Sequence, residues 1–254
     1  NFILSVYYRI IEILHNKEFP KNHEDLYPGE YVIDIAKKIL DKKLINEFGN
    51  FEIIHEQLKE VAIKESLDLI KVNLSSLGIQ HDHFVFESQL FKNNEIQNTV
   101  EKLKKKNLIY HGEITAPKSK DGKNWKLRNQ LLFKSTLYGD DKDRPLQKND
   151  LSWTYFAGDL AYHNNKIQRD FSDLINILGA DHAGYIKRIS AGVEALSNKK
   201  VKFNCKVSQL VKLLKEGKPF KMSKRKGDYI TVEDIINEVG RDPVRFIMLS
   251  RSND

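Results

Sequence analysis

Apolar residues recur at helical spacing through most of the first eighty positions. Residues 51–77 have the clearest pattern, in which apolar side chains lie three and four apart and Gly78 follows as a terminator. The positions that carry this spacing are Ile54, Leu58, Val61 and Ala62. Residues 1–45 predict two helices separated by a turn at 26–29, where proline and glycine are adjacent. The first quarter of the chain is therefore predicted to be helical.

In the middle of the chain, apolar residues follow the two-residue period of a strand in some segments and the helical period in others. The run from Gln80 to Ser88 alternates and predicts a short strand, with Phe84 and Phe86 on one face. A helix is predicted next, from the spacing of Ile96, Val100 and Leu103.

Two β-prone segments follow, Leu108–Thr115 and Gln130–Leu137. They flank Asp121–Gly122, which is a turn signal. The pattern predicts an antiparallel module that lies on the surface.

Strands and helices alternate from about residue 151. Helices are predicted at 156–166 and 185–196, and strands at 174–178 and 201–207. This alternation is typical of a parallel sheet with helical crossovers. Two capped helices are expected at the end, one after Thr231 and one opened by Asp242 and Pro243 and running over 245–250. The fold class is therefore α/β: the second half of a doubly wound sheet, lacking its first βαβ unit, with a mixed module inserted.

Composition narrows the class of protein. The 254 residues are 40% hydrophobic, which excludes wholesale disorder, and no apolar run is long enough to cross a membrane. Cys205 is the single cysteine, so an internal disulfide framework and a cysteine-rich zinc site are excluded. The first residues have no signal-peptide pattern and no start methionine. We expect a truncated chain from a cytoplasmic or organelle-matrix protein.

Net charge points to a class of partner. Lys and Arg number 42 against 35 Asp and Glu, a net charge of +7. This excess is compatible with nucleic acid or a nucleotide as partner, and equally with lysines that are merely solvated.

The strand predicted at 174–178 runs into a polar turn. Gly179 would let backbone approach a ligand beyond the carboxyl end of the strand, which is where open α/β sheets bind ligands. Asp181 can accept hydrogen bonds from a ribose or a cationic substrate, and His182 can donate or accept. The alternative is that Asp181 only caps the next helix.

A basic loop, Lys221–Gly227, has four cations in its first six residues. Lysine is a compact charge that can close on a polyphosphate leaving group. A solvated basic loop is the plain alternative, although the order Lys221-Met222-Ser223-Lys224 is more specific than a generic run.

Tyr155 and Asp159 are four residues apart and would share one helical face. An aromatic ring beside a carboxylate suits a guanidinium, which stacks on rings and pairs with carboxylates. The alternative places Tyr155 in the core. Two other features predict little chemistry: His81 and His83 lack a third metal ligand nearby, and Cys205 lies on an alternating strand.

Taken together, these residues resemble a known family. Lys221–Lys224 is similar to the second signature of the class I aminoacyl-tRNA synthetases, and the other segments are similar to arginyl-tRNA synthetases in particular. Those segments are Leu26–Tyr31, Leu132–Asp141, Trp153–His163, Gly179–His182, Gly184–Arg188 and Gly240–Phe246. The resemblance spans nearly the whole chain, and it implies a class I synthetase Rossmann-like parallel sheet with an inserted α+β connective module.

The resemblance also implies roles for these residues. Lys224, assisted by Lys221 and Ser223, would stabilise the departing pyrophosphate, and backbone around Phe220 and Met222 would hold adenine. Gly179, Asp181 and His182 would line the ribose and amino-acid pocket, and Tyr155 and Asp159 would recognise the arginine guanidinium. Asp181 belongs to the arginine or to the ribose, and the sequence does not separate the two.

By the same resemblance, the substrates are ATP with Mg²⁺, L-arginine and tRNA(Arg), joined through an arginyl-adenylate. The expected regions are helical catalytic sequence at 1–50, connective insertion at 51–135, second sheet half at 136–220, and the basic loop with following helices at 221–254. The insertion would contact the tRNA acceptor end through its lysines. We expect a monomer, no membrane, and no protein ligand for the metal.

The chain departs from the family in four ways. The first signature, His-x-Gly-His, is absent, as are an N-terminal appended domain and a helical anticodon-binding domain. Gly158 stands where the family often has a larger residue. We therefore expect this chain to be a fragment that is inactive alone. The competing hypotheses are a non-catalytic RNA-binding paralogue, another class I synthetase such as a lysine-specific one, and a nucleotidyltransferase of related fold.

Overall fold

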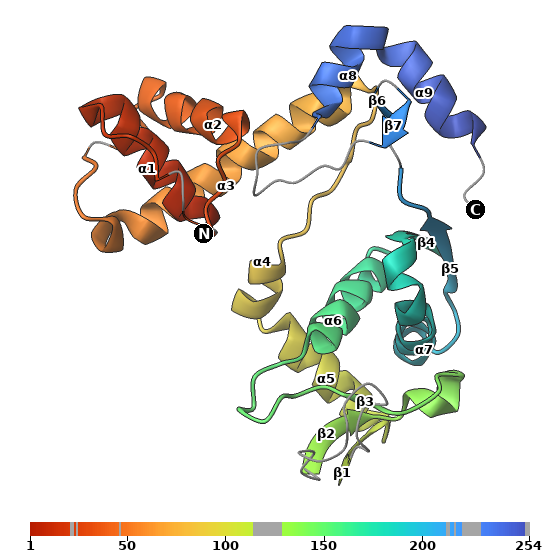
Figure 1. Cartoon of the computed structure of the whole chain (residues 1–254). Coiled ribbons are helices and arrows are strands. Elements are labelled where there is room, and N and C mark those ends of the chain that lie inside the picture. The colour runs from red at the N-terminus through yellow and green to blue at the C-terminus, as the bar shows by residue number, and fades with distance from the viewer. Residues whose placement is uncertain are drawn as a thin grey trace. The chain divides into compact units, whose positions relative to one another are not determined.

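The chain forms two compact units in the computed structural model (Figure 1). The structure describes residues 1–20, 23, 25–45, 47–113, 129–211, 214–215, 217–219 and 230–251. One unit combines Asn1–Asp82 with Val211–Ser252, and the other comprises His83–Leu210. These boundaries differ from the four functional regions expected from the sequence, which remain predictions.

Three helices build the core of the first unit: α1 (Phe2–His15), α2 (Glu30–Asp41) and α3 (Phe51–Ser76). Their apolar stripes meet in one cluster, with Ile10, Ile35 and Leu58 essentially inaccessible to solvent. Gly78, with φ +70°, follows the C-terminus of α3, as the sequence predicts. None of the described helices is both long and apolar enough to cross a bilayer.

The C-terminal part of this unit contains β6 (Leu214–Lys215), β7 (Lys218–Pro219), α8 (Val232–Val239) and α9 (Arg241–Ser250). The predicted cap of α8 is confirmed, because the Thr231 hydroxyl accepts from the Asp234 backbone N–H at 3.0 Å in a reciprocal capping box. α9 begins at Arg241, earlier than predicted, and Arg245 ties it to α3 by donating to the Leu77 carbonyl at 2.6 Å.

The second unit begins with α4 (Glu87–Lys92) and α5 (Glu95–Lys105). The helix predicted from Ile96, Val100 and Leu103 is confirmed as α5. The strand predicted over 80–88 is wrong: 80–86 is irregular and Glu87 opens a helix. Phe84 and Phe86 are only half-buried, and no described strand pairs with them, so alternation there does not reflect a sheet.

A three-stranded antiparallel sheet follows, formed by β1 (Ile109–Glu113), β2 (Asn129–Phe133) and β3 (Arg144–Pro145). The antiparallel pairing is confirmed for β1 with β2, but Ser135–Leu137, the end of the second predicted strand segment, belongs to a 3₁₀ turn at Ser135–Tyr138. The predicted Asp121–Gly122 turn lies outside the described residues. The expected surface position holds for β1, whose Tyr110, His111 and Glu113 are exposed. It does not hold for the end of β2, because Leu132 and Phe133 are 2% and 0% exposed and Phe133 joins the core under the helices.

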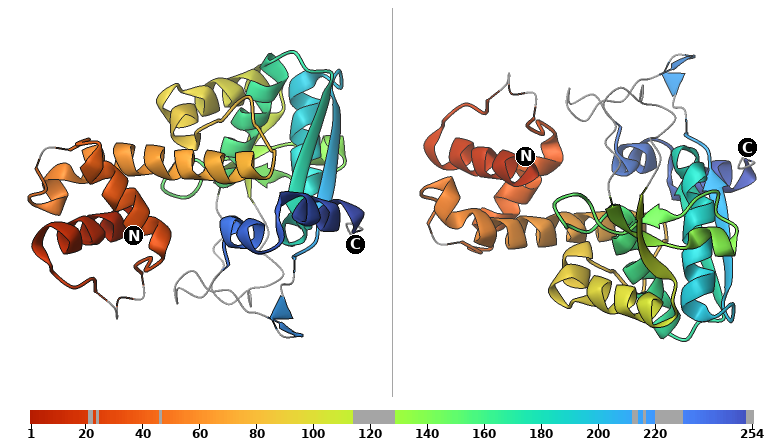
Figure 2. Two further views of the ribbon diagram at one scale, coloured as in Figure 1. Left: turned by 90° about the horizontal axis from the view of Figure 1, so that it is seen from above. Right: turned by 90° about the horizontal axis from the view of Figure 1, so that it is seen from below.

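The α/β half is confirmed. α6 (Tyr155–Gln168), β4 (Asp173–Gly179), α7 (Ile186–Ser197) and β5 (Lys202–Ser208) follow in order, with a 3₁₀ turn at Ala180–Tyr185. β4 and β5 pair in parallel, from Asp173 opposite Lys202 to Gly179 opposite Ser208. α6 and α7 lie on one side of this pair (Figure 2), where Leu160, Leu174 and Val193 share one apolar core.

The other face of β4 exposes apolar side chains in the described part of the chain. Ile175 and Ile177 on β4 are 62% and 76% exposed. Parallel sheets are normally covered on both faces, so this pair has the character of part of a larger sheet.

Candidate active site

The beginning of α6 is held by its own cap. Thr154 accepts from the Ala157 N–H at 3.3 Å, while its hydroxyl donates to the Pro145 carbonyl at 2.9 Å. Tyr155 opens the helix with 77% of its surface exposed, and Asp159 follows one turn later, half-buried. The alternative that places Tyr155 in the core is therefore wrong.

Asp159 lies in a mixed electrostatic environment. Burial raises the pKa of its carboxyl group, while a polar contact with the Tyr185 hydroxyl lowers it. The charge of Glu87 raises the same pKa, and those of Arg188 and His182 lower it. Burial is the largest of these effects, so the pKa of Asp159 is raised overall.

Sequence reasoning missed Glu87, Tyr185 and Arg188 as members of this site. Glu87 opens α4, and its Oε1 lies 3.8 Å from the point that a Cβ on Gly158 would occupy. A larger residue at 158 would extend toward that carboxylate, so the unusual glycine was the available signal. The Arg188 guanidinium carbon lies 4.3 Å from the centre of the Tyr185 ring.

The predicted polar turn forms at the carboxyl end of β4. A Cβ on Gly179 would lie 2.5 Å from the Asp181 Oδ1, so the turn requires glycine unless that carboxylate moves. His182 Nε2 lies 3.4 Å from Asp181 Oδ2, and both side chains are exposed. Neither the turn nor α7 has a side-chain cap, so the alternative in which Asp181 only caps the helix is wrong.

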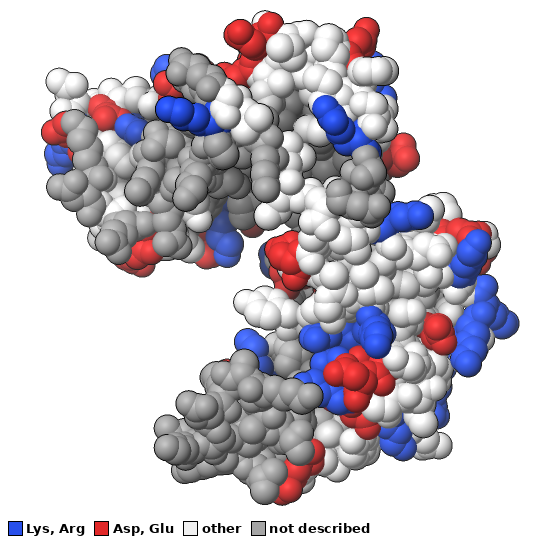
Figure 3. Space-filling model, turned by 45° about the vertical axis from the view of Figure 1, so that its right-hand side comes forward, with Lys and Arg blue, Asp and Glu red and all other residues white. Residues whose placement is uncertain are grey.

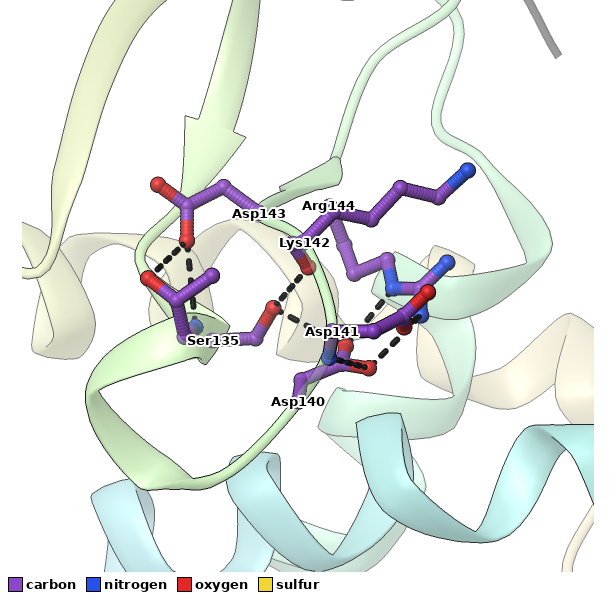
Figure 4. A network of polar contacts seen from close by, with 7 residues as sticks. Ser135, Asp140, Asp141, Lys142, Asp143 and Arg144 are labelled. Carbon is purple, nitrogen blue, oxygen red and sulfur yellow. Dashed lines mark hydrogen bonds and ion pairs between the residues drawn. The ribbon is translucent and has the colours of Figure 1, made fainter.

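A buried polar network supports the loop that leads into α6 (Figure 4). Arg144 donates two hydrogen bonds of 2.6 Å to Asp140 and also contacts Asp141. Ser135 Oγ lies 3.0 Å from Asp140 Oδ2 and 2.8 Å from the Lys142 carbonyl. The loop is thereby closed on itself.

Charge pairing outweighs burial in this network. Burial alone would raise the pKa of Asp140, but hydrogen bonds from Arg144 and from its other neighbours hold that pKa far below its usual range. Arg144 opens β3, the strand that precedes the Thr154 cap. The network therefore fixes the position from which α6 starts.

The remaining predicted residues lie outside the described part of the chain. They are Phe220, Lys221, Met222, Ser223 and Lys224. Among the residues that the structure describes, no cluster of three or more His, Cys, Asp or Glu side chains is placed to hold a metal ion.

The fold and the site define a class. A parallel strand ending in a glycine turn, beside a helix that presents an aromatic ring and a carboxylate, is typical of α/β proteins that bind small ligands beyond their strand ends.

Comparison with known proteins makes the class specific. The chain is 61% identical to an arginine--tRNA ligase of Pelagibacter ubique over 254 residues, which is all of this chain and 44% of that protein. It is 46% identical to the enzyme of Roseobacter denitrificans over 253 residues, 98% of this chain and 43% of that protein. No family model matches.

A solved structure agrees with these relatives. A Campylobacter jejuni protein described as an arginyl-tRNA synthetase matches all of this chain and 52% of its own, with a TM-score of 0.76 and 34% identity. The chain belongs to the arginyl-tRNA synthetases, which are class I aminoacyl-tRNA synthetases. It spans less than half the length of the curated relatives described above.

Proposed function

We propose that this chain is the arginine- and ATP-binding part of an enzyme that attaches L-arginine to tRNA(Arg). The reaction would pass through an arginyl-adenylate, with release of pyrophosphate and then AMP. The observation that carries the proposal is Asp159, a half-buried carboxylate beside Glu87, one helical turn after the exposed ring of Tyr155.

The arrangement suits arginine better than lysine. A guanidinium is planar, donates in two directions and stacks on aromatic rings. Asp159 and Glu87 would accept its N–H groups, and Tyr155 would cover one face of it. An ammonium can also lie over a ring, as Lys148 Nζ does 5.7 Å from the centre of the Tyr155 ring, but it cannot stack flat on the ring or present the planar fork of donors that pairs with carboxylates.

The turn after β4 would hold the nucleotide. Gly179 keeps the turn open to a close approach, and Asp181 and His182 are exposed at the strand's carboxyl end, where they can bond to a ribose or to the amino acid. The reaction joins the arginine carboxylate to the α-phosphorus of ATP and expels pyrophosphate. Positioning and charge stabilisation suffice for this step, and no covalent protein intermediate is needed.

The basic loop would stabilise the leaving group. By family resemblance, Lys221, Ser223 and Lys224 would contact pyrophosphate, and Phe220 and Met222 would contact adenine. Magnesium would accompany ATP on its phosphate oxygens. The described residues offer no cluster of three or more His, Cys, Asp or Glu side chains to hold it.

Transfer RNA is the second substrate in this proposal, and residues 51–135 would meet its acceptor end. Exposed lysines such as Lys104 and Lys105 lie at the end of α5. On the face drawn in Figure 3, basic side chains are interspersed with acidic ones. Lysines that contact the tRNA phosphates would release counterions. The KM for tRNA should therefore rise with salt.

The test is amino-acid-dependent ATP–pyrophosphate exchange by the full-length protein that contains this chain. All twenty amino acids are compared, with and without tRNA. Exchange with arginine alone supports the proposal. Exchange with lysine would overturn the assignment of Tyr155 and Asp159, and no exchange from a folded protein would favour a non-catalytic RNA-binding role.

A further inference from the structure

A polar pair, the buried His163 and the half-buried Asn176, interrupts the apolar packing between α6 and β4. The inward face of β4 carries Leu174, Asn176 and Leu178, of which only Asn176 is polar. Opposite it, His163 of α6 is 4% exposed, with the Phe203 ring edge-on at 5.6 Å between centroids. Neither polar side chain belongs to the ligand pocket described above.

The polar atoms form a directed chain. Lys166 Nζ lies 2.8 Å from Asn176 Oδ1, Asn176 Nδ2 lies 2.9 Å from His163 Nε2, and His163 Nδ1 lies 2.7 Å from the Asp159 carbonyl oxygen. An ammonium only donates, so the amide oxygen faces Lys166 and the amide nitrogen faces His163. His163 Nε2 must then accept, and Nδ1–H donates to the carbonyl.

The chemistry of His163 fits this chain. Burial is the main cause that lowers its pKa, to about 4, and the charge of Lys166 lowers it further, against the opposing effect of the Asp159 carbonyl. The imidazole is therefore neutral at pH 7, as an accepting Nε2 requires.

The position of the pair gives it a consequence. Apolar contacts tolerate sliding of a helix along a sheet, whereas one buried hydrogen-bonded pair is satisfied at a single register. His163 lies one turn after Asp159, and Asn176 lies three residues before Gly179. The pair joins the helix that presents the carboxylate to the strand that ends at the polar turn.

We propose that His163 is a positioning residue that, through Asn176, sets the register of α6 on β4 and thereby the placement of Asp159 relative to the Gly179–His182 turn. The proposal rests on the proposed function, because its effect on arginine binding presumes that Asp159 receives the guanidinium. His163 acts through the strand and not by touching substrate.

Two isosteres separate the two hydrogen bonds of His163. In His163→Gln, the amide oxygen reaches the position of Nε2 and can still accept from Asn176. In His163→Asn, the shorter amide can still donate to the Asp159 carbonyl but does not reach Asn176. Asn165→Ala is the matched control, since Asn165 donates from the same helix to Glu95 of α5 at 3.3 Å instead of to the strand.

The first measurement is the KM for arginine and for ATP in exchange assays of the full-length protein. His163→Asn should raise the arginine KM about tenfold, as expected for one lost buried hydrogen bond, and leave the ATP KM within about twofold. His163→Gln and Asn165→Ala should keep the arginine KM within about threefold of the wild type. Partial unfolding alone would lower kcat without changing either KM. A change in the arginine KM without a change in the ATP KM therefore distinguishes a positioning role of His163 from a general loss of stability.

The second measurement does not depend on activity. Amide hydrogen exchange of peptides covering 174–182 should accelerate in His163→Asn and stay at the wild-type rate in His163→Gln. If the wild type does not exchange pyrophosphate with arginine, the proposed function fails and this measurement still decides the register. The inference is overturned if the Asn and Gln variants behave alike, or if His163→Asn matches the wild type.

Discussion

Asp159 lies half-buried between charges of both signs, and its neighbours come from two separate stretches of sequence. Tyr185 and Arg188 follow β4, whereas Glu87 comes from α4, about seventy residues earlier in the chain. A carboxylate in this setting stabilises a bound guanidinium more than a solvent-exposed one would, because water screens the pair less.

Replacing Asp159 by Asn tests this directly. The side chain keeps its size and loses its charge, so the arginine KM should rise by about one to two orders of magnitude, as expected for a lost charge-assisted hydrogen bond. The ATP KM should not change. Steady-state exchange kinetics measure both values, with Asp173→Asn, an exposed carboxylate at the opposite end of β4, as the control. An unchanged arginine KM would remove Asp159 from the pocket.

The buried imidazole of His163 gives a pH signature. Its pKa in the folded state is about 4, below the ordinary value of 6.5, so the unfolded chain binds the extra proton first as the pH falls. Stability should therefore be unaffected above about pH 7 and should drop by about 2–3 kcal/mol between pH 7 and 4.5.

The measurement is urea unfolding at several pH values, compared between the wild type and His163→Gln. The glutamine variant has no imidazole at this position, so it should show a shallower loss of stability on acidification. Parallel curves for the two proteins would contradict a depressed pKa at His163.

At this scale the sequence predicts well where chemistry is local. Tyr155 and Asp159 share a helix, and Gly179, Asp181 and His182 share a turn, so spacing alone places each group. Glu87 lies near the site only because the chain folds back against Gly158, and local sequence spacing does not predict this contact. The Lys221–Lys224 segment remains a prediction.

Elements were predictable where one face of each is buried against a core. α3, α6, β4 and β5 follow their apolar periodicity, since burial of one side fixes both the period and the register. The strand predicted at 80–88 is wrong because no core among the described residues buries one face of it. The alternating phenylalanines there are half-buried in a loop, and the described sheets provide no partner strand. The parallel pairing of β4 with β5 was predictable from the helix between them.

The crossing of α6 and α7 depends on a glycine. A Cβ on Gly192 would lie 2.2 Å from a methyl carbon of Leu160, which is fully buried and has no solvent to turn into. Gly192→Ala should lower the unfolding free energy by about 1–2 kcal/mol, because overpacking exceeds the gain in helix propensity.

Denaturant unfolding measures this loss, with Gly49→Ala as the control, since no atom lies within 4 Å of a Cβ placed there. Adding Leu160→Val to the Gly192→Ala chain should recover part of the loss. Additive effects of the two substitutions would show that the helices do not meet at this pair.

Each compact unit has a hydrophobic core of its own. One cluster is centred on Ile10, Ile39 and Leu58, and the other on Phe133, Leu160 and Val193. Separate cores permit separate unfolding, so a single transition is not assured for the chain. The fold class of the whole chain was predictable from the sequence. The boundaries between the two units, near residues 82 and 210, were not, because they depend on contacts between residues distant in sequence.

Truncations in the two cores should therefore act on different transitions. Leu58→Ala and Leu160→Ala each remove a fully buried side chain, at an expected cost of about 2–5 kcal/mol. In a Trp125→Phe background, Trp153 reports on the second unit alone, while circular dichroism reports on the helices of both. Leu160→Ala should shift the fluorescence transition and Leu58→Ala should not; equal shifts would mean that the units unfold as one.

The exposed isoleucines of β4 affect which substitutions this sequence tolerates. Ile175 and Ile177 are mostly exposed in this chain, so a change to threonine or serine here removes little packing and reduces the tendency of the chain to aggregate. A library of variants scored on this chain alone would rank such changes as neutral or beneficial. In a longer relative whose additional residues cover that face, the same substitutions would be unfavourable. Selection against them at these two positions would then come from the covering residues.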